Sequence, residues 1–120
     1  MSTNMPPSLS YALNSAATTN ANLIQAGTTR LTGFVLNNAA IAAKFVRFYN
    51  NATAPVPGTD TPVLVVSLGI GATVILPPAE GMVFPLGLGI AITNLAAVLD
   101  NTAVAAGDVQ ALVSYIPNVS

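Results

Sequence analysis

Residues 44–50 read Lys-Phe-Val-Arg-Phe-Tyr-Asn, and this stretch decides the fold class. Its β-branched and aromatic residues favour an extended strand. Because successive side chains of a strand point to opposite faces, each face mixes one basic residue with large apolar ones: Lys44, Val46 and Phe48 on one, Phe45, Arg47 and Tyr49 on the other. Neither face is polar. The pattern predicts a sandwich strand whose outer face is also covered, by contact with another subunit.

Similar short runs lie on both sides of this stretch, separated by turn-forming residues at a spacing typical of strands. The expected strands are residues 9–13, 23–25, 31–37, 44–50, 63–68, 73–76, 82–84, 89–94 and 108–116. The Ala-rich stretches 38–43 and 95–99 have room for a helical turn but not for a crossover helix. The sequence therefore predicts an all-β fold, a two-sheet sandwich of jelly-roll type with about eight or nine short strands.

The length of 120 residues predicts one domain, and area scaling predicts a folded surface of about 6,000 Å². Residues 1–29 carry no charge, and Pro6 and Pro7 fix an extended entry to the chain. We therefore expect residues 1–13 to form an extended N-terminal arm and the first strand. Residues 14–120 are expected to form a single β-sandwich domain.

Charged side chains are scarce, at 6% of the residues against about 25% in ordinary soluble domains. Only three are basic, too few to neutralise the phosphates of a nucleic acid, which excludes nucleic acid as an expected partner. A surface with so little charge also offers little repulsion between copies. The composition predicts that much of this surface is covered by copies of the chain or by a larger assembly.

Catalytic and metal-binding residues are also scarce, because the chain has no His and no Cys. Imidazole acid–base catalysis, thiol chemistry and the commonest zinc ligands are excluded. We find no activated nucleophile and no phosphate-binding loop, and expect neither an enzyme nor a cofactor. Asp100 and Asp108 flank one loop and could share a cation with Asn101 and Thr102, but these residue types equally form turns, so no metal site is expected.

Two uncharged runs, residues 61–79 and 81–99, are long enough to cross a bilayer. Proline and glycine interrupt both runs, so we expect strands and no membrane partner. The N-terminal residues 1–7 lack the basic region and apolar stretch of a secretory signal, which predicts synthesis in a cytoplasm.

The segment Pro57-Gly58-Thr59-Asp60 has the composition of a rigid loop. Proline fixes φ, glycine permits a positive φ, and the Asp60 carboxylate can accept hydrogen bonds from nearby backbone N–H groups. The alternative is that Asp60 contacts a partner or a cation, although a single carboxylate is a poor calcium site.

The three basic residues allow two alternatives, which both stay open at this point. In the first, they form salt bridges between subunits or point at an acidic partner. In the second, the side chains of Lys44 and Arg47 simply end in water along sheet edges or faces. Together with Asp60 and with residues of the arm and first strand, the three basic residues form the set of candidate interface residues: Met5, Pro6, Leu9, Tyr11, Arg30, Lys44, Arg47 and Asp60.

Several segments resemble a recurring pattern in small structural proteins of tailed bacteriophages. The longest is Phe45-Val-Arg-Phe-Tyr-Asn-Asn-Ala-Thr-Ala-Pro-Val-Pro-Gly-Thr-Asp-Thr-Pro-Val-Leu64. The segments Gly81-Met-Val-Phe-Pro-Leu-Gly-Leu-Gly-Ile-Ala91 and Ala105-Ala-Gly-Asp-Val109 extend the resemblance over residues 28–116. Pro77-Pro78, in place of a longer polar turn, and the charge-free arm depart from the pattern.

The resemblance implies a capsid decoration, or cement, protein that binds the major capsid protein on the virion surface. It also implies a compact β-sandwich that is commonly a homotrimer, assembled in the host cytoplasm. One alternative is a virion adhesin or head-fibre module that binds host glycans, which predicts exposed aromatic rings because sugars stack on them. Another is a self-assembling surface protein, suggested by the apolar run 63–70, although this run equally suits a core strand.

Overall fold

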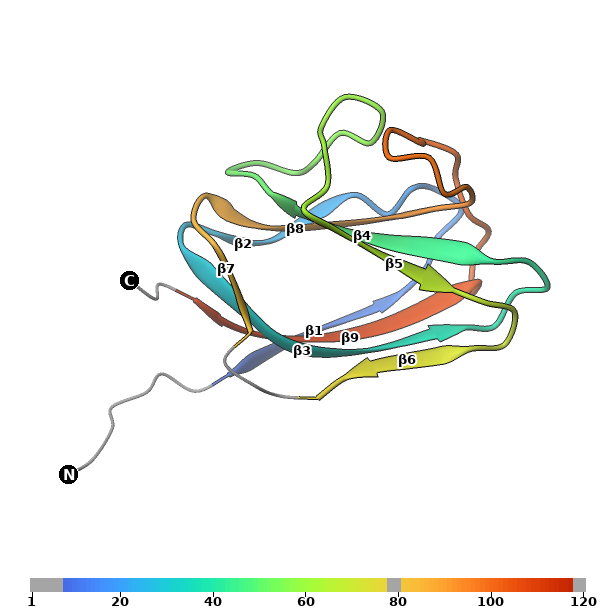
Figure 1. Ribbon diagram of the computed structural model, residues 1–120, viewed down its shortest axis with the longest axis horizontal. Helices are drawn as coiled ribbons and strands as arrows, with labels where there is room; N and C mark the ends of the chain where they lie inside the picture. Colours follow the sequence, from blue (N-terminus) through green and yellow to red (C-terminus); the bar gives the residue numbers. More distant parts are fainter. Residues whose placement is uncertain (1–7, 78–80, 118–120) are drawn as a thin grey trace.

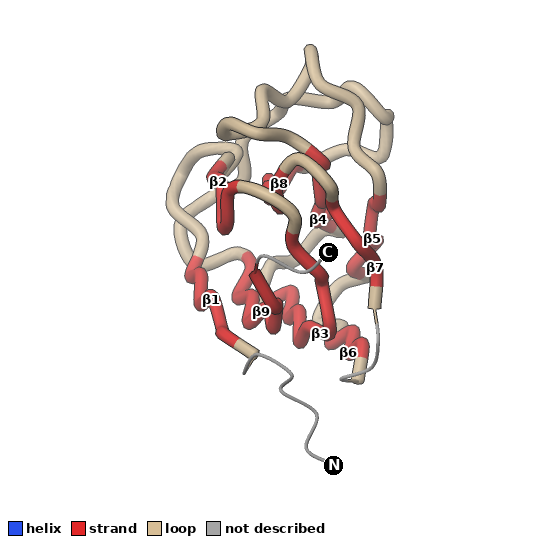
Figure 2. Tube along the Cα trace, turned by 90° about the vertical axis from the view of Figure 1, so that its left-hand side faces the viewer, coloured by secondary structure: helices blue, strands red, loops and turns tan. Residues whose placement is uncertain are grey.

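The computed structural model describes residues 8–77 and 81–117, which form nine strands in two antiparallel sheets and no helix. Sheet A has the order β1 (Leu9–Asn14), β9 (Val109–Pro117), β3 (Thr29–Asn38), β6 (Thr73–Leu76), with β7 (Met82–Phe84) also paired to β3. Sheet B has the order β2 (Asn22–Ala26), β8 (Gly87–Thr93), β4 (Lys44–Asn50), β5 (Leu64–Leu68). The two sheets lie face to face (Figure 1, Figure 2).

The predicted all-β, two-sheet fold is confirmed, and each expected strand is present with ends shifted by a few residues. The stretches 38–43 and 95–99 form bends and turns and no helical turn. The solvent-accessible surface of 5966 Å² agrees with the area expected from the mass. Within the described ranges there is no apolar helix of a length that crosses a bilayer.

Strand pairing is nested along the chain. β1 pairs with β9, β2 with β8, β3 with β6 and β4 with β5, so the first half of the chain pairs with the second half in reverse order. Two further ladders, β3 with β9 and β4 with β8, join these pairs into sheets. The chain is therefore one long hairpin folded over so that its pairs alternate between sheets. Residues 9–13, expected with the arm, pair along their whole length with β9.

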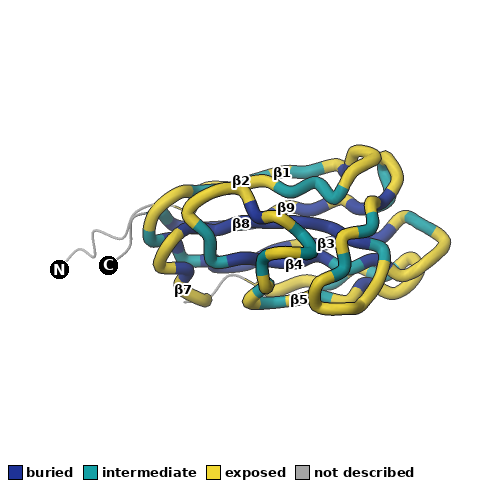
Figure 3. The backbone as a smooth tube through the Cα atoms, turned by 90° about the horizontal axis from the view of Figure 1, so that it is seen from above, coloured by how far each residue is buried: buried dark blue, intermediate teal, exposed yellow. Residues whose placement is uncertain are grey.

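The core lies between the sheets and is aliphatic and aromatic. The rings of Phe34 on sheet A and Phe48 on sheet B stack with centroids 5.5 Å apart. Along β9 the side chains alternate as predicted, with Val109 and Val113 buried and Gln110 and Leu112 exposed. Figure 3 shows the buried backbone following the central strands, while the connections are largely exposed.

Two of the chain's own loops cover the outer face of sheet B. β8 places small residues beside the large side chains of β4, with Ala91 opposite Arg47 and Gly89 opposite Tyr49. Pro55 from the loop 51–62 packs so closely that a Cβ on Gly89 would lie 2.9 Å from its Cδ. Arg47 and Tyr49 are fully buried as a result. The strand is covered on both faces, as predicted, but the cover is intramolecular and not the expected second subunit.

Candidate interaction surfaces

Two of the four predicted interface residues near the N-terminus, Leu9 and Tyr11, lie in the part of the chain that the structure describes. Met5 and Pro6 lie outside the described residues. Leu9 begins β1 and is 43% exposed. Tyr11 is half-buried against the core, and its hydroxyl accepts a hydrogen bond from Asn22 Nδ2 at 3.1 Å. This bond joins the edge strand of sheet A to the edge strand of sheet B, so Tyr11 closes one side of the sandwich.

Arg47 is a buried cation that organises a loop. Its Nε donates to Thr93 Oγ1 at 2.8 Å, and its Nη1 and Nη2 donate to the carbonyls of Val98 and Leu95, both at 2.7 Å. The planar guanidinium spans two carbonyls that a point charge could not reach together. Neither alternative weighed from the sequence, a salt bridge between subunits or an end in water, describes this residue. Arg47 instead holds the loop 94–103 over sheet B.

Lys44, the first residue of β4, also bonds within the chain. Its Nζ lies 3.3 Å from Asp108 Oδ2 and donates a hydrogen bond to Asn94 Oδ1. Asp108 Oδ2 also accepts from the backbone N–H of Ala105 at 2.9 Å. The ion pair therefore joins β4 to the loop before β9, and both charges are satisfied within one chain.

Asp60 forms the rigid loop that its sequence predicted. Its Oδ2 accepts hydrogen bonds from the backbone N–H of Val56 and from Asn51 Nδ2, both at 2.8 Å. Gly58 has φ +92°, the left-handed conformation expected there. The carboxylate also faces Tyr49, where burial raises the pKa of the phenol, Arg47 lowers it and Asp60 raises it further. The carboxylate thus has an intramolecular structural role.

Asp100 stabilises the loop that Arg47 holds. Its Oδ2 accepts hydrogen bonds from Thr102 Oγ1 at 2.6 Å and from the backbone N–H groups of Leu95 and Thr102. Burial alone would raise the pKa of Asp100, but these bonds favour the charged form and leave the pKa lowered. Intramolecular hydrogen-bond donors contact the carboxylates of both Asp100 and Asp108. Over residues 8–77 and 81–117 no group of acidic side chains is arranged to hold a metal ion.

The variant Asp100→Asn should be less stable than the wild type at neutral pH, by less than about 1 kcal/mol because the site is near the surface. A group with a lowered folded-state pKa stabilises the fold above its unfolded pKa and loses this contribution as the pH falls. The difference between variant and wild type should therefore disappear below the ordinary value of 3.8. Urea unfolding at neutral and acidic pH measures this difference in stability. A difference that does not change with pH would contradict the stabilising role of the charged Asp100 carboxylate.

Among residues 8–77 and 81–117, no loop covers the outer face of sheet A in this way. Val35 on β3 is paired with Ile75 on β6 and with Leu112 on β9, which places the three side chains in one row. They are 40%, 62% and 47% exposed, respectively. Arg30, the remaining predicted interface cation, lies half-buried on β3 between Ile116 and Val83. An uncharged aliphatic row on an open sheet face is typical of a surface that meets a partner.

No known protein family, curated protein or solved structure matches this chain. Its function is therefore inferred from its own residues.

Proposed function

We propose that this chain is a capsid decoration protein, a non-enzymatic component of a virion that associates with copies of itself, as a homotrimer, and with the major capsid protein. The observation that carries the proposal is the row of Val35, Ile75 and Leu112 on the open face of sheet A. The resemblance of residues 28–116 to phage structural proteins supports it independently.

The distribution of charge explains why such a chain would need to be covered. Five of its charged side chains, Lys44, Arg47, Asp60, Asp100 and Asp108, bond within the chain and stabilise its loops. They contribute little to repulsion between molecules. A neutral apolar surface can dock on a shell without the cost of desolvating charges, and each Å² of apolar area buried contributes about 25 cal/mol. Binding to the assembled shell and not to its free subunits would stabilise the shell by mass action.

The nested strand pairing supports a jelly roll as the form of this sandwich. Folding a long hairpin so that its strand pairs alternate between two sheets produces two interlocked four-stranded sheets, and the orders β1-β9-β3-β6 and β2-β8-β4-β5 have this relation. β7 is an addition at the margin of sheet A.

The glycan-binding alternative has less support. All seven aromatic residues lie in the described ranges, and each is buried or half-buried. A sugar platform needs a ring with an open face. We therefore do not propose an adhesin.

Co-sedimentation with shells tests the proposed function. The purified chain is mixed with DNA-free shells assembled from the major capsid protein of the same genome. We expect saturable binding at a fixed ratio to the shell subunit, and binding that persists at high salt because no charge pair is needed. A folded chain that leaves the shells unbound, or that binds glycans on an array instead, would overturn the proposal.

A further inference from the structure

Two isoleucines stand at one end of the sandwich with almost no cover. Ile41, in the connection between β3 and β4, is 94% exposed, and Ile70, in the turn between β5 and β6, is 69% exposed. Both connections lie at the right-hand end of the molecule in Figure 1. Turn geometry does not require isoleucine at either place, since glycine, proline and small polar residues form turns. We call Ile41, Ile70 and their connections, residues 39–43 and 69–72, the knob.

Asn38 fixes the two parts of the knob to each other. Its side chain is 1% exposed, and its Nδ2 lies within hydrogen-bond distance of the carbonyls of Ala42 at 2.9 Å and Gly69 at 3.1 Å. The turn itself is closed by a hydrogen bond from Ala72 N to the Gly69 carbonyl at 3.0 Å. The isoleucines are therefore presented on ordered backbone, and little conformational entropy is lost when they pack against a partner.

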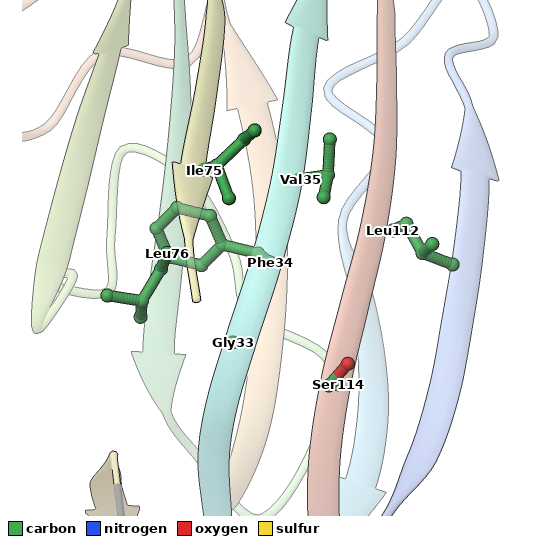
Figure 4. Close-up of a pocket in the computed structure, with 7 residues that line it drawn as sticks. All are labelled: Gly33, Phe34, Val35, Ile75, Leu76, Leu112 and Ser114. Carbon is green, nitrogen blue, oxygen red and sulfur yellow. The ribbon is translucent and has the colours of Figure 1, made fainter. Parts of the chain in front are cut away.

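A hollow of about 90 Å³ lies on a different surface, the outer face of sheet A. Figure 4 shows its lining, with Leu76 and Ile75 on one side and Leu112 on the other. Gly33 has no side chain, and its cross-strand partner Ser114 has a small one. The floor of the hollow between the aliphatic side chains is therefore formed close to the sheet backbone. We call this site the hollow; its lining residues are Gly33, Phe34, Val35, Ile75, Leu76, Leu112 and Ser114.

We propose that the knob of one copy packs into the hollow of a second copy. This names the contact behind the self-association in the proposed function, and rests on that part of it. The knob is at the end of the molecule and the hollow is on its face, so the contact joins two different surfaces. Such a contact is heterologous: every copy offers a knob to one neighbour and a hollow to the other, and the assembly closes as a ring when the rotation permits.

The chemistry and size of the two surfaces favour this partner. Neither includes a charged residue, so the contact desolvates no ion. The hollow is small, at about 90 Å³, and aliphatic side chains form most of its lining, which suits a branched aliphatic side chain.

The area available also favours a ring. The molecule measures 28 × 19 Å across its long axis. The rectangle enclosing this end is about 500 Å², so an end-on contact covers at most about 500 Å² per copy, or about 1,000 Å² in total, the lower limit for a specific interface. In a ring each copy makes this contact twice, which doubles the area buried per copy.

Two variants remove one surface each. The double variant Ile41→Asp/Ile70→Asp removes the knob, and Ser114→Trp fills the hollow while making the face more apolar. Val98→Asp is the matched control, because Val98 is also an exposed loop residue, at 55%, but lies over sheet B. Leu112→Thr is a second hollow variant in case Ser114→Trp does not fold. Circular dichroism and thermal unfolding verify folding.

Light scattering on size-exclusion fractions measures the assembly. We expect the wild type and Val98→Asp at a multiple of 12.1 kDa, and the knob and hollow variants as monomers. Mixing the two variants should restore a single contact and give a one-to-one heterodimer, since each retains the surface that the other has lost. An unchanged mass for the knob variant, stronger association of Ser114→Trp, or a mixture without heterodimer would overturn the contact. A monomeric wild type would also overturn it, and if that monomer still bound shells, the decoration role itself would stand.

Discussion

Replacing Arg47 by methionine should lower the free energy of unfolding by about 2–4 kcal/mol. Methionine keeps most of the apolar stem but removes the three hydrogen bonds of the guanidinium. A hydrogen bond to a charged group contributes about 1.5–3 kcal/mol, and part of this is recovered because the variant no longer buries a charge. The Val98 carbonyl loses its guanidinium donor and the Leu95 carbonyl keeps only the longer bond from Thr93 Oγ1, so the loop 94–103 should separate from sheet B before the sandwich unfolds.

The conservative substitution Arg47→Lys should lower the free energy of unfolding at least as much as Arg47→Met. Lysine keeps the charge, but its single nitrogen cannot reach Thr93 and both carbonyls at once. No carboxylate forms a salt bridge with residue 47 in the described structure, so the ammonium group would be buried with incomplete hydrogen bonding. If Arg47→Lys loses as much unfolding free energy as Arg47→Met, or more, the stabilising feature is the forked geometry of the guanidinium and not its positive charge.

Urea unfolding and hydrogen exchange of residues 94–103 measure both effects. The matched control is Thr93→Val, which has nearly the same shape and keeps both guanidinium–carbonyl bonds; it removes the bond to Nε and the longer bond, 3.3 Å, from Thr93 Oγ1 to the Leu95 carbonyl. It should cost about 1 kcal/mol. A lysine variant as stable as the wild type would show that the carbonyl contacts of the guanidinium contribute little.

The strands could be predicted from sequence because their signals are local. Alternation in β9 and the turn residues between runs specify the elements without reference to distant parts of the chain. The Asp60 loop was predictable for the same reason, since the carboxylate bonds to a backbone N–H four residues away. Local chemistry of this kind is present in any short window of sequence.

The environment of Arg47 could not be predicted because its partners are remote. The carbonyls that it binds are 48 and 51 residues away, and carbonyls leave no signature in the sequence. The aromatic and basic pattern of β4 did indicate a covered outer face. It could not tell whether the cover was a loop of the same chain or a second subunit. The knob was missed for a related reason: Ile41 and Ile70 are apolar, and only the three-dimensional structure shows that both are exposed.

Replacing Asn38 by alanine should also lower the free energy of unfolding by about 2–4 kcal/mol. The Asn38 amide donates toward the carbonyls of Ala42, Leu68 and Gly69, and its oxygen accepts from Ala40 N. A buried polar group that loses its partner costs about 1–3 kcal/mol, and the bond to Leu68 lies in the buried interior. The matched control is Asn37→Ala: its oxygen accepts only an exposed bond from Thr73, so the loss there should stay below about 1 kcal/mol. Chemical denaturation measures the unfolding free energies of both variants. Equal losses at the two positions would show that the buried hydrogen bonds of Asn38 add no stability beyond an exposed bond.

The variant Asn38→Asp separates the donor role of this side chain from its acceptor role. Aspartate still accepts from Ala40 N, but its carboxylate faces three carbonyl oxygens, which raises its folded-state pKa. The folded state then binds the proton more tightly than the unfolded state, so stability is lost as the pH rises above about 3.9. We expect Asn38→Asp to be less stable than Asn38→Ala at neutral pH and to approach it in acid. Because Asn38 also holds the two connections of the knob together, both variants should associate more weakly than the wild type where they are still folded. Loosened connections without a change in association would mean that the exposed isoleucines act independently of the backbone that presents them.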